Sequence, residues 1–296
     1  MIADSQARKI PVIPPPDQRM RVVVDSDAKC EIDDQWAIAL AIMSTERFDI
    51  EGFIGANYLG SGGPGGVENS ALEIETILSK AGMSGRWPVK RGSNPMQFEN
   101  LPSESEGVNF IIERAMAGSP ENPLWVIGIG AATDTASAFV KEPRIAGRVV
   151  VFHHFRTRWP EKAYNYNVFG DMRAARVIFH SPLPFVLFDT GTYLTCTMEE
   201  SAREVASYGE LGKYLHEYRH RNAGFQSPKK GFFDMGDIAA LLDPSLAAWE
   251  VAPCPEVDWD LDYIFNDKHG LILRCYHVDR DRSFALLYQK LRQYFG

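Results

Sequence analysis

Residues 22–40, VVVDSDAKCEIDDQWAIAL, join an apolar run to a helical pattern through a loop crowded with carboxylates. The three valines are typical of a buried strand, and the apolar residues from Trp36 onward recur at helical spacing. A strand that leads directly into a helix in this way is the opening unit of a parallel α/β sheet. Since ligands bind at the carboxyl ends of the strands in such sheets, this stretch predicts both the fold class and the position of a site.

The same alternation of short apolar runs and helical stretches continues along the chain. Strands are expected at residues 21–24, 50–55, 87–90, 124–129, 148–153 and 184–188, and helices at 33–43, 68–80, 107–117, 133–141 and 171–179. From about residue 198 we expect helices at 200–208, 211–219 and 235–242, a strand pair near 249–252 and 271–277, and a closing helix from residue 280. These repeated βαβ units predict a single-domain, open and mostly parallel sheet flanked by helices, with a Rossmann-like core.

Two segments stand outside this alternation. Residues 1–20 contain Pro11 and three consecutive prolines from Pro14, which favour an extended arm lying on a neighbouring surface or on a second subunit. The α/β domain then covers residues 21–296, because no linker interrupts them. The stretch SGGPGG at residues 61–66 follows an expected strand end and is predicted to be a flexible loop that acts as a mobile lid.

The composition narrows the class of protein. Lys+Arg 31 and Asp+Glu 39 give a formal net charge of −8, whereas binding nucleic-acid phosphates or anionic membranes requires a dense Lys/Arg face. The four cysteines show no CxxC spacing, the N-terminus lacks a signal-peptide pattern, and no apolar run approaches the roughly 18 residues of a membrane span. We therefore expect a cytoplasmic protein with neither a nucleic-acid nor a membrane partner.

Five acids gather after the first expected strand: Asp25, Asp27, Glu31, Asp33 and Asp34. Carboxylates this close repel one another unless a bound cation, a basic partner or raised pKa values offset the repulsion. Oxygen ligands without an accompanying Cys/His set favour a hard cation, Ca²⁺ or Mg²⁺. An EF-hand loop is disfavoured, because its fifth and sixth positions would be Lys29 and Cys30 instead of an oxygen ligand and a glycine.

Two other interpretations of these acids remain open. Acids at a helix start satisfy free backbone N–H groups and the helix dipole, which accounts for Asp33 and Asp34. It does not account for Asp25 and Asp27, because an unpaired charge at the end of a buried strand is costly. An Asp-x-Asp at a strand end also suits a divalent-metal phosphohydrolase, although residues 61–66 lack the GxxxxGK[ST] spacing of a phosphate-binding loop.

The acidic stretch resembles the signature of the inosine-uridine-preferring nucleoside hydrolase family, an Asp-x-Asp, a short loop and an Asp-Asp pair between the first strand and helix. Further segments match in the same chain order: GFIGANY (52–58), PVKRGSNP (88–95), IGAATDTA (129–136), NYNVFGDMRAARVIF (165–179), FDMGDIAALLDP (233–244) and HVDRDR (277–282). The resemblance implies the family's α/β fold and Ca²⁺-dependent hydrolysis of the N-glycosidic bond of a nucleoside or related ribosyl compound. A nucleoside- or sugar-binding protein without hydrolysis is the alternative. By analogy the resemblance also implies nucleoside salvage and a homodimer or homotetramer.

The resemblance also implies site residues. The calcium ligands would be the carboxylates of Asp27, Asp34 and Asp237 and the backbone carbonyl of Thr133. Asp27 would also be the catalytic base that deprotonates the attacking water, and Asp34 would bind the ion through both oxygens. The ribose would be bound by Asp33, Asn57 and Asn167, with Asn165 where the family often has a ribose-binding Glu. Asp25 would support the metal ligands without contacting the attacking water.

The acidic loop departs from the family pattern. Five residues separate Asp27 from Asp33, where the common family form has three, and the longer loop carries Lys29 and Glu31. Glu31 would then be an additional metal ligand or an ion-pair partner of Lys29. The longer loop also leaves open which acid takes each role.

A second departure concerns the leaving base. Many family members place a His directly before the calcium-binding Asp, where it helps to protonate the departing base, but this chain has Gly236 before Asp237. His153 and His154 follow an expected strand and are alternative proton donors, or else structural residues at a strand end.

Overall fold

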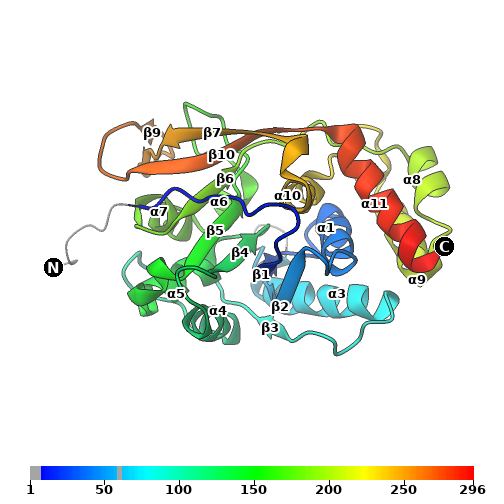
Figure 1. The fold of residues 1–296 in the computed structure, drawn as a ribbon, viewed down its shortest axis with the longest axis horizontal. Helices are drawn as coiled ribbons and strands as arrows, with labels where there is room; N and C mark the ends of the chain where they lie inside the picture. The colour runs from blue at the N-terminus through cyan, green and yellow to red at the C-terminus, as the bar shows by residue number, and fades with distance from the viewer. Residues whose placement is uncertain (1–7, 59–61) are drawn as a thin grey trace.

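The computed structural model describes residues 8–58 and 62–296 of the protein, which are built around an eight-stranded sheet (Figure 1). Its strands are β1 (Met20–Ser26), β2 (Phe48–Gly55), β3 (Val89–Arg91), β4 (Leu124–Gly128), β5 (Val149–His154), β6 (Phe185–Phe188), β7 (Ala247–Pro253) and β10 (Leu271–Val278). The strand order is β3-β2-β1-β4-β5-β6-β10-β7, and within this sheet only β7 is antiparallel to its neighbour. Two short strands, β8 (Glu256–Val257) and β9 (Tyr263–Ile264), pair separately. The predicted open and mostly parallel sheet is confirmed.

The central strands are buried on both faces. β4 reads LWVIG and β5 reads VVVFHH, and every residue of both strands is buried. Such runs suit a parallel sheet, because helices cover both of its faces. β1 pairs with β2 on one side and with β4 on the other, so the strand order reverses between β1 and β4. In open α/β sheets, the ligand crevice lies at the carboxyl ends of the strands at this reversal.

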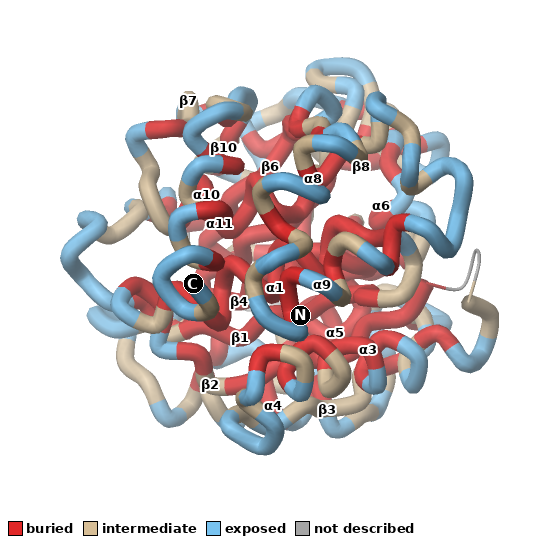
Figure 2. The backbone as a smooth tube through the Cα atoms, turned by 90° about the vertical axis from the view of Figure 1, so that its right-hand side faces the viewer, coloured by how far each residue is buried: buried red, intermediate tan, exposed pale blue. Residues whose placement is uncertain are grey.

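Helices enclose one hydrophobic core on each face of the sheet (Figure 1). The first face carries α1 (Asp33–Ile42), α3 (Gly66–Lys80), α9 (Gly209–Tyr218), α10 (Phe233–Leu242) and α11 (Arg280–Phe295). The second face carries α4 (Glu106–Ala117), α5 (Thr133–Lys141) and α7 (Met172–His180). The remaining elements are α6 (Tyr166–Gly170), α8 (Met198–Glu204) and the 3₁₀ helices η1 (Gly63–Gly65), η2 (Pro143–Gly147), η3 (Arg219–Arg221), η4 (Ala223–Gln226) and η5 (Pro244–Leu246). Figure 2 shows the buried backbone passing through the centre of the molecule, with exposed segments at its periphery.

α1 and α10 pack against each other and are buried on nearly all sides. All ten residues of α1 and eight of the ten residues of α10 are buried. Trp36 of α1 is fully buried, and its ring centroid lies 4.3 Å from that of Phe232, just before α10. Because both helices begin with acids, this packing places carboxylates from two distant parts of the chain inside the protein.

The glycine-rich stretch differs from its prediction. Where a loop was expected at 61–66, the described part is helical, because η1 occupies Gly63–Gly65 and α3 begins at Gly66. The expected flexibility and lid role stay predictions. Residue 61 lies outside the described residues. Glycine is required at position 62 by close approach, since a Cβ there would lie 2.3 Å from the ring of Tyr58.

The described part of the N-terminal segment, residues 8–19, contains neither helix nor strand and lies against its own chain. The buried guanidinium of Arg8 donates hydrogen bonds to the carbonyls of Ile178 and Phe179 near the end of α7. The buried guanidinium of Arg47 likewise donates to the carbonyl of Pro14. Two arginines thus satisfy backbone carbonyls that regular secondary structure leaves free.

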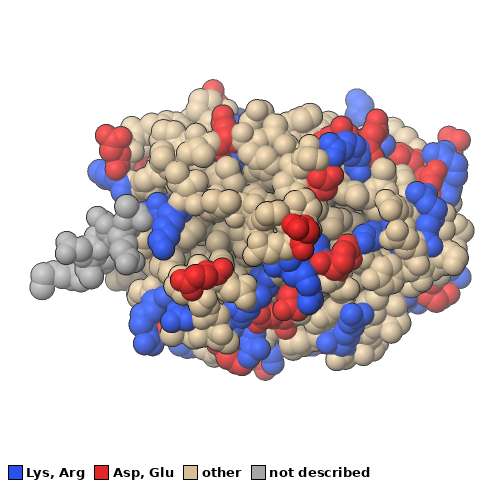
Figure 3. All heavy atoms as spheres, in the orientation of Figure 1, with Lys and Arg blue, Asp and Glu red and all other residues tan. Residues whose placement is uncertain are grey.

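Charged side chains of both signs are interspersed on the face drawn in Figure 3, without a broad basic surface. Within the described ranges, no helix combines the length and apolar character needed to cross a membrane.

Candidate active site

A cavity of about 140 Å³ opens beside the carboxyl end of β1, near the point where the strand order reverses. Seven of the residues singled out from the sequence line it: Asp27, Glu31, Asp33, Asp34, His154, Asn165 and Asn167. An adjoining cavity of about 60 Å³ is lined by Asn57 as well as by Asp27 and Asn167. The fold therefore brings residues of the acidic loop together with residues from β5 and the start of α6.

The acidic loop is held by its own backbone and by Ser26. The N–H groups of Lys29 and Cys30 donate to the carbonyl of Asp27 over 2.7 and 2.8 Å, which closes a tight turn after β1. The hydroxyl of Ser26 donates to Oδ1 of Asp34 over 2.6 Å and ties the start of α1 to the strand end. Burial, reinforced by the neighbouring Asp33, raises the pKa of Asp34 to about 8. Burial and the nearby Asp34 raise the pKa of Asp27 well above its usual range.

α10 contributes two further buried acids, Asp234 and Asp237, to the same region. Nδ1 of His154 lies 2.7 Å from Oδ2 of Asp237 and 3.5 Å from Oδ1 of Asp234. Burial raises the pKa of Asp237 to about 6, although the contact with His154 opposes the rise. The second oxygen of Asp237, Oδ1, is buried and accepts no hydrogen bond from the described residues. Asp234 was not singled out from the sequence; its spacing of three residues before Asp237 on a helix is the signal that could have found it.

These groups form a donor set that suits a divalent metal. One ligand atom each from Asp33, Asp34 and Asp234 lie within 4.8 Å of one another, and the same holds for His154, Asp234 and Asp237. Buried carboxylates with raised pKa values and an orphaned oxygen are what a cation site presents before the cation binds. The predicted ligands Asp27, Asp34 and Asp237 thus belong to one acidic region.

The predicted ribose-binding asparagines are fixed by hydrogen bonds. Nδ2 of Asn57 donates to the carbonyl of Ser93 and to Oγ1 of Thr133, both over 2.9 Å, while its buried Oδ1 has no partner among the described residues. Nδ2 of Asn167 donates to the carbonyl of His154 over 3.0 Å. Oδ1 of Asn165 accepts from the N–H of Asn167 over 2.8 Å and caps α6.

Thr133 begins α5, and its hydroxyl donates to Oδ2 of Asp171 over 2.8 Å. Its side chain therefore connects Asn57, from which it accepts a hydrogen bond, to an acid on the second face of the sheet. The contact orients the asparagine toward the adjoining cavity.

One interpretation of the sequence expected Glu31 to pair with Lys29, but each of these residues has a different partner in the structure. Lys29 instead pairs with the buried Glu73 over 2.7 Å, and Glu31 pairs with Lys230. The ammonium of Lys230 also lies 3.4 Å from Asp33, so it places a positive charge against the acids. The partner of Glu31 differs from the expected one because Lys230 reaches the loop from a segment 199 residues away in the sequence.

His153 and Asp25 lie outside the cavity. Nε2 of His153 lies 3.0 Å from the carbonyl of Gly130, and its ring centroid is 4.0 Å from that of Phe155. Burial lowers the pKa of His153 to about 3, so the imidazole is neutral and serves as a structural group at the strand end. Both carboxylate oxygens of Asp25 are buried without a hydrogen-bond partner in the described part of the chain, and burial together with Asp134 raises its pKa.

The position before Asp237 accepts a side chain only if Leu194 moves. A Cβ on Gly236 would lie 2.5 Å from Cδ1 of Leu194 and 3.1 Å from the ring of Phe188. A histidine therefore does not fit here in the observed packing.

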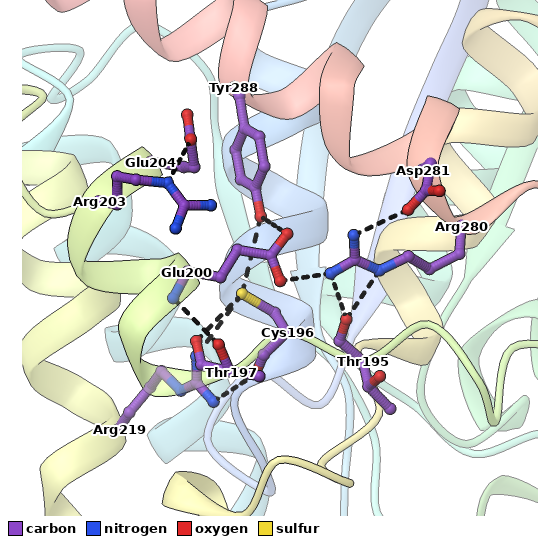
Figure 4. Close-up of polar contacts among 10 residues, drawn as sticks. All are labelled: Thr195, Cys196, Thr197, Glu200, Arg203, Glu204, Arg219, Arg280, Asp281 and Tyr288. Carbon is purple, nitrogen blue, oxygen red and sulfur yellow. Dashed lines mark hydrogen bonds and ion pairs between the residues drawn. The ribbon is translucent and has the colours of Figure 1, made fainter.

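A network of arginines supports the segment that delivers Lys230. Arg219 donates to the carbonyl of Cys196 over 2.7 Å, and Arg280 donates to that of Thr195 over 2.9 Å (Figure 4). Thr195 in turn forms an isolated bridge with Gly231, the residue after Lys230. Burial raises the pKa of Cys196 to about 11, so this thiol is a structural group.

Comparisons with known proteins agree with this architecture. The family described as inosine-uridine preferring nucleoside hydrolase matches residues 22–279. Among solved structures, a plant nucleoside hydrolase has a TM-score of 0.70 at 20% identity, with 94% of this chain and 99% of that chain covered. A purine-preferring ribonucleoside hydrolase from Gardnerella vaginalis has a TM-score of 0.68 at 19% identity, covering 93% and 98%. An inosine-uridine preferring nucleoside hydrolase from Bacillus anthracis has a TM-score of 0.67 at 17% identity, covering 93% and 99%. A comparison with curated protein sequences finds no match.

Proposed function

The chain belongs to the inosine-uridine preferring nucleoside hydrolase family, a family of N-ribohydrolases, and from this premise we propose that it is a Ca²⁺-dependent hydrolase of a nucleoside or related ribosyl compound. The products are the free base and ribose. One observation carries the proposal: carboxylates from the loop after β1 and from α10 converge at a single cavity at the reversal of the strand order. A cytoplasmic location and a homodimer or homotetramer remain predictions.

The calcium ion would be held by Asp27, Asp34 and Asp237 together with the backbone carbonyl of Thr133. Two features support this set: the three acids are buried, and Oδ1 of Asp237 has no partner among the described residues. Oxygen donors of this kind suit a hard cation. When bound, the cation lowers the pKa of a water molecule and orients it.

Asp27 is the proposed base that takes the proton from the attacking water. Cleavage of an N-glycosidic bond passes through an oxocarbenium-like ribosyl cation, which a positioned water then captures. Asp27 lines both cavities, one together with the other acids and the second together with Asn57. The raised pKa that burial and Asp34 give Asp27 suits a group that must accept a proton during the reaction.

The ribose hydroxyls would be bound by Asp33, Asn57, Asn165 and Asn167. Asn57 offers its free Oδ1 as an acceptor, while its amide nitrogen is held in place by Ser93 and Thr133. One oxygen of Asp33 accepts from the N–H of Phe233 over 3.1 Å, which fixes the carboxylate beside the cavity. Fixed donors and acceptors of this kind hold the ring while it flattens toward the transition state.

The departing base would leave without the histidine donor that many family members use. Gly236 occupies that position, and Leu194 fills the space a side chain would need. His154 lines the cavity, but its Nδ1 faces Asp237. The proposed enzyme therefore favours bases that leave readily, since proton donation by a positioned acid is worth about 10²- to 10⁴-fold in rate.

The test is reducing-sugar release from purine and pyrimidine nucleosides and from nicotinamide riboside, with added Ca²⁺ and again with chelator. Release that the chelator abolishes and Ca²⁺ restores would support the proposal. Absence of release from every nucleoside, in protein shown to bind Ca²⁺, would reject it in favour of a binding role.

A further inference from the structure

His154, Asp234 and Asp237 form a compact group beside the acids of the loop after β1. Nδ1 of His154 lies 2.7 Å from Asp237 and 3.5 Å from Asp234. All three residues are buried, with 3%, 6% and 0% of the residue surface exposed for His154, Asp234 and Asp237. We propose that these three residues form a second divalent-metal site next to the proposed calcium site, and that the imidazole ligand makes it select a transition metal such as Mn²⁺ or Zn²⁺.

The three ligands are set by rigid elements. His154 is the last residue of β5, and Asp234 and Asp237 stand one turn apart on α10. The imidazole ring is packed beside Phe188 and Phe233, with centroid distances of 5.4 and 6.4 Å. Because a strand end and a helix supply the donors, binding an ion requires little rearrangement.

Charge balance favours two ions over one. Asp27, Asp33, Asp34, Asp234 and Asp237 are five buried carboxylates in one region. Glu31, which lines the same cavity and pairs with Lys230, is a sixth carboxylate. Lys230, Arg156 of the cavity lining and one divalent cation supply four positive charges, whereas a second divalent cation raises the total to six. Without it, the acids must bind protons or remain unpaired in a buried environment.

Asp237 supplies an independent observation. Its Oδ2 faces His154, whereas its buried Oδ1 meets no hydrogen-bond donor in the described residues. A buried carboxylate that has one oxygen beside an imidazole and the other without a donor has an oxygen available to a cation, and a carboxylate can bridge two cations, as in two-metal hydrolytic sites. The inference rests on the proposed function only through the calcium ion, because Asp237 would be a ligand of both ions.

The donor chemistry separates the two sites. Carboxylate and carbonyl oxygens alone suit Ca²⁺. An imidazole nitrogen with two carboxylates suits Zn²⁺, Fe²⁺ or Mn²⁺, because nitrogen ligands favour transition metals over calcium. The number of ions bound per chain should therefore depend on the metal: Ca²⁺ should fill only the first site, whereas Mn²⁺ or Zn²⁺ should fill both.

The test counts metal ions in the full chain. Metal-free protein is equilibrated with Ca²⁺ alone, Mn²⁺ alone or Zn²⁺ alone, and the bound metal is measured by mass spectrometry. We expect about one Ca²⁺ per chain but about two Mn²⁺ or Zn²⁺. Electron paramagnetic resonance of the Mn²⁺ protein should show the spin coupling of a close pair.

Two variants locate the second ion. Asp234→Asn and His154→Gln should each reduce Mn²⁺ from about two to about one per chain and abolish the spin coupling. Asp243→Asn, the same substitution just beyond α10 at a residue that pairs with Arg282, is the matched control and should retain both ions.

One outcome overturns the inference even if neither variant folds: a single, uncoupled Mn²⁺ in the wild-type protein. Two ions in Asp234→Asn or His154→Gln would also overturn the assignment to these residues. Because metal is counted without turnover, loss of the second ion leaves the proposed hydrolysis to be judged by its own assay.

Discussion

Lys230 makes a contact that sequence spacing cannot reveal, because it lies 197 residues from Asp33 and 199 from Glu31. Its ammonium is largely buried, while the carboxylate of Glu31 is half exposed. A cation held against the acids opposes the approach of a second cation through Coulomb repulsion. We therefore expect Lys230 to moderate metal affinity as well as to neutralise charge in the metal-free protein.

Replacing this lysine should tighten metal binding. For Lys230→Met we expect Ca²⁺ affinity to rise by about fivefold at low salt, roughly 1 kcal/mol, because one positive charge leaves the region. Isothermal titration calorimetry measures the change, and Lys229→Met at the neighbouring, exposed position is the control. Unchanged or weaker Ca²⁺ binding in Lys230→Met, with the control unaltered, would contradict this role.

The site residues predicted from the sequence agree best with the structure where they lie close together along the chain. Asp27, Asp33 and Asp34 share one short loop and helix start, so their convergence follows from the strand-to-helix pattern alone. Asp234 could have been found from its helical spacing to Asp237, whereas Lys230 escaped prediction because nothing in the local pattern indicates that its segment packs against that loop.

Among the elements, α10 determines the character of the site through its packing. It supplies Asp234, which lines the cavity, and the fully buried Asp237, and a side chain at Gly236 would meet Leu194. Long helices with clear apolar periodicity were predicted well, as α5 and α11 show by starting at the expected residues. α6, β8 and β9 were missed because α6 spans little more than one helical turn and β8 and β9 have two residues each, so none of them shows a repeat. The helix expected at 200–208 is instead α8, Met198–Glu204, since Thr197 caps its start.

The glycine in α10 can be tested directly. Gly236→Ala should destabilise the protein by about 1–3 kcal/mol, because the added methyl overlaps Leu194. Shortening the neighbour in Gly236→Ala/Leu194→Ala should cost less than the two single substitutions together, which urea unfolding can measure. Strictly additive losses would show that the overlap with Leu194 does not exclude a side chain at position 236.

For the whole molecule, the fold class was predictable and the strand order was not. Repeated βαβ units predict a parallel sheet, but only the structure shows that β1 lies between β2 and β4 and that the last-third helix α10 packs on α1. This long-range pairing joins two carboxylate sources into one site. The net charge of −8 argues against partners that require a dense basic face, while the base and sugar preference depends on cavity residues that composition does not describe.

The most direct measurement is hydrolysis by Asp27→Asn compared with the wild type, on whichever nucleoside the wild type cleaves. The account predicts that kcat/KM falls by at least about 100-fold, because the amide cannot take the proton from water. The unfolding midpoint of the metal-free variant should not fall, since Asp27 is a buried acid whose charge is unfavourable there. Full turnover by a folded Asp27→Asn protein would contradict the assignment of catalysis to this residue.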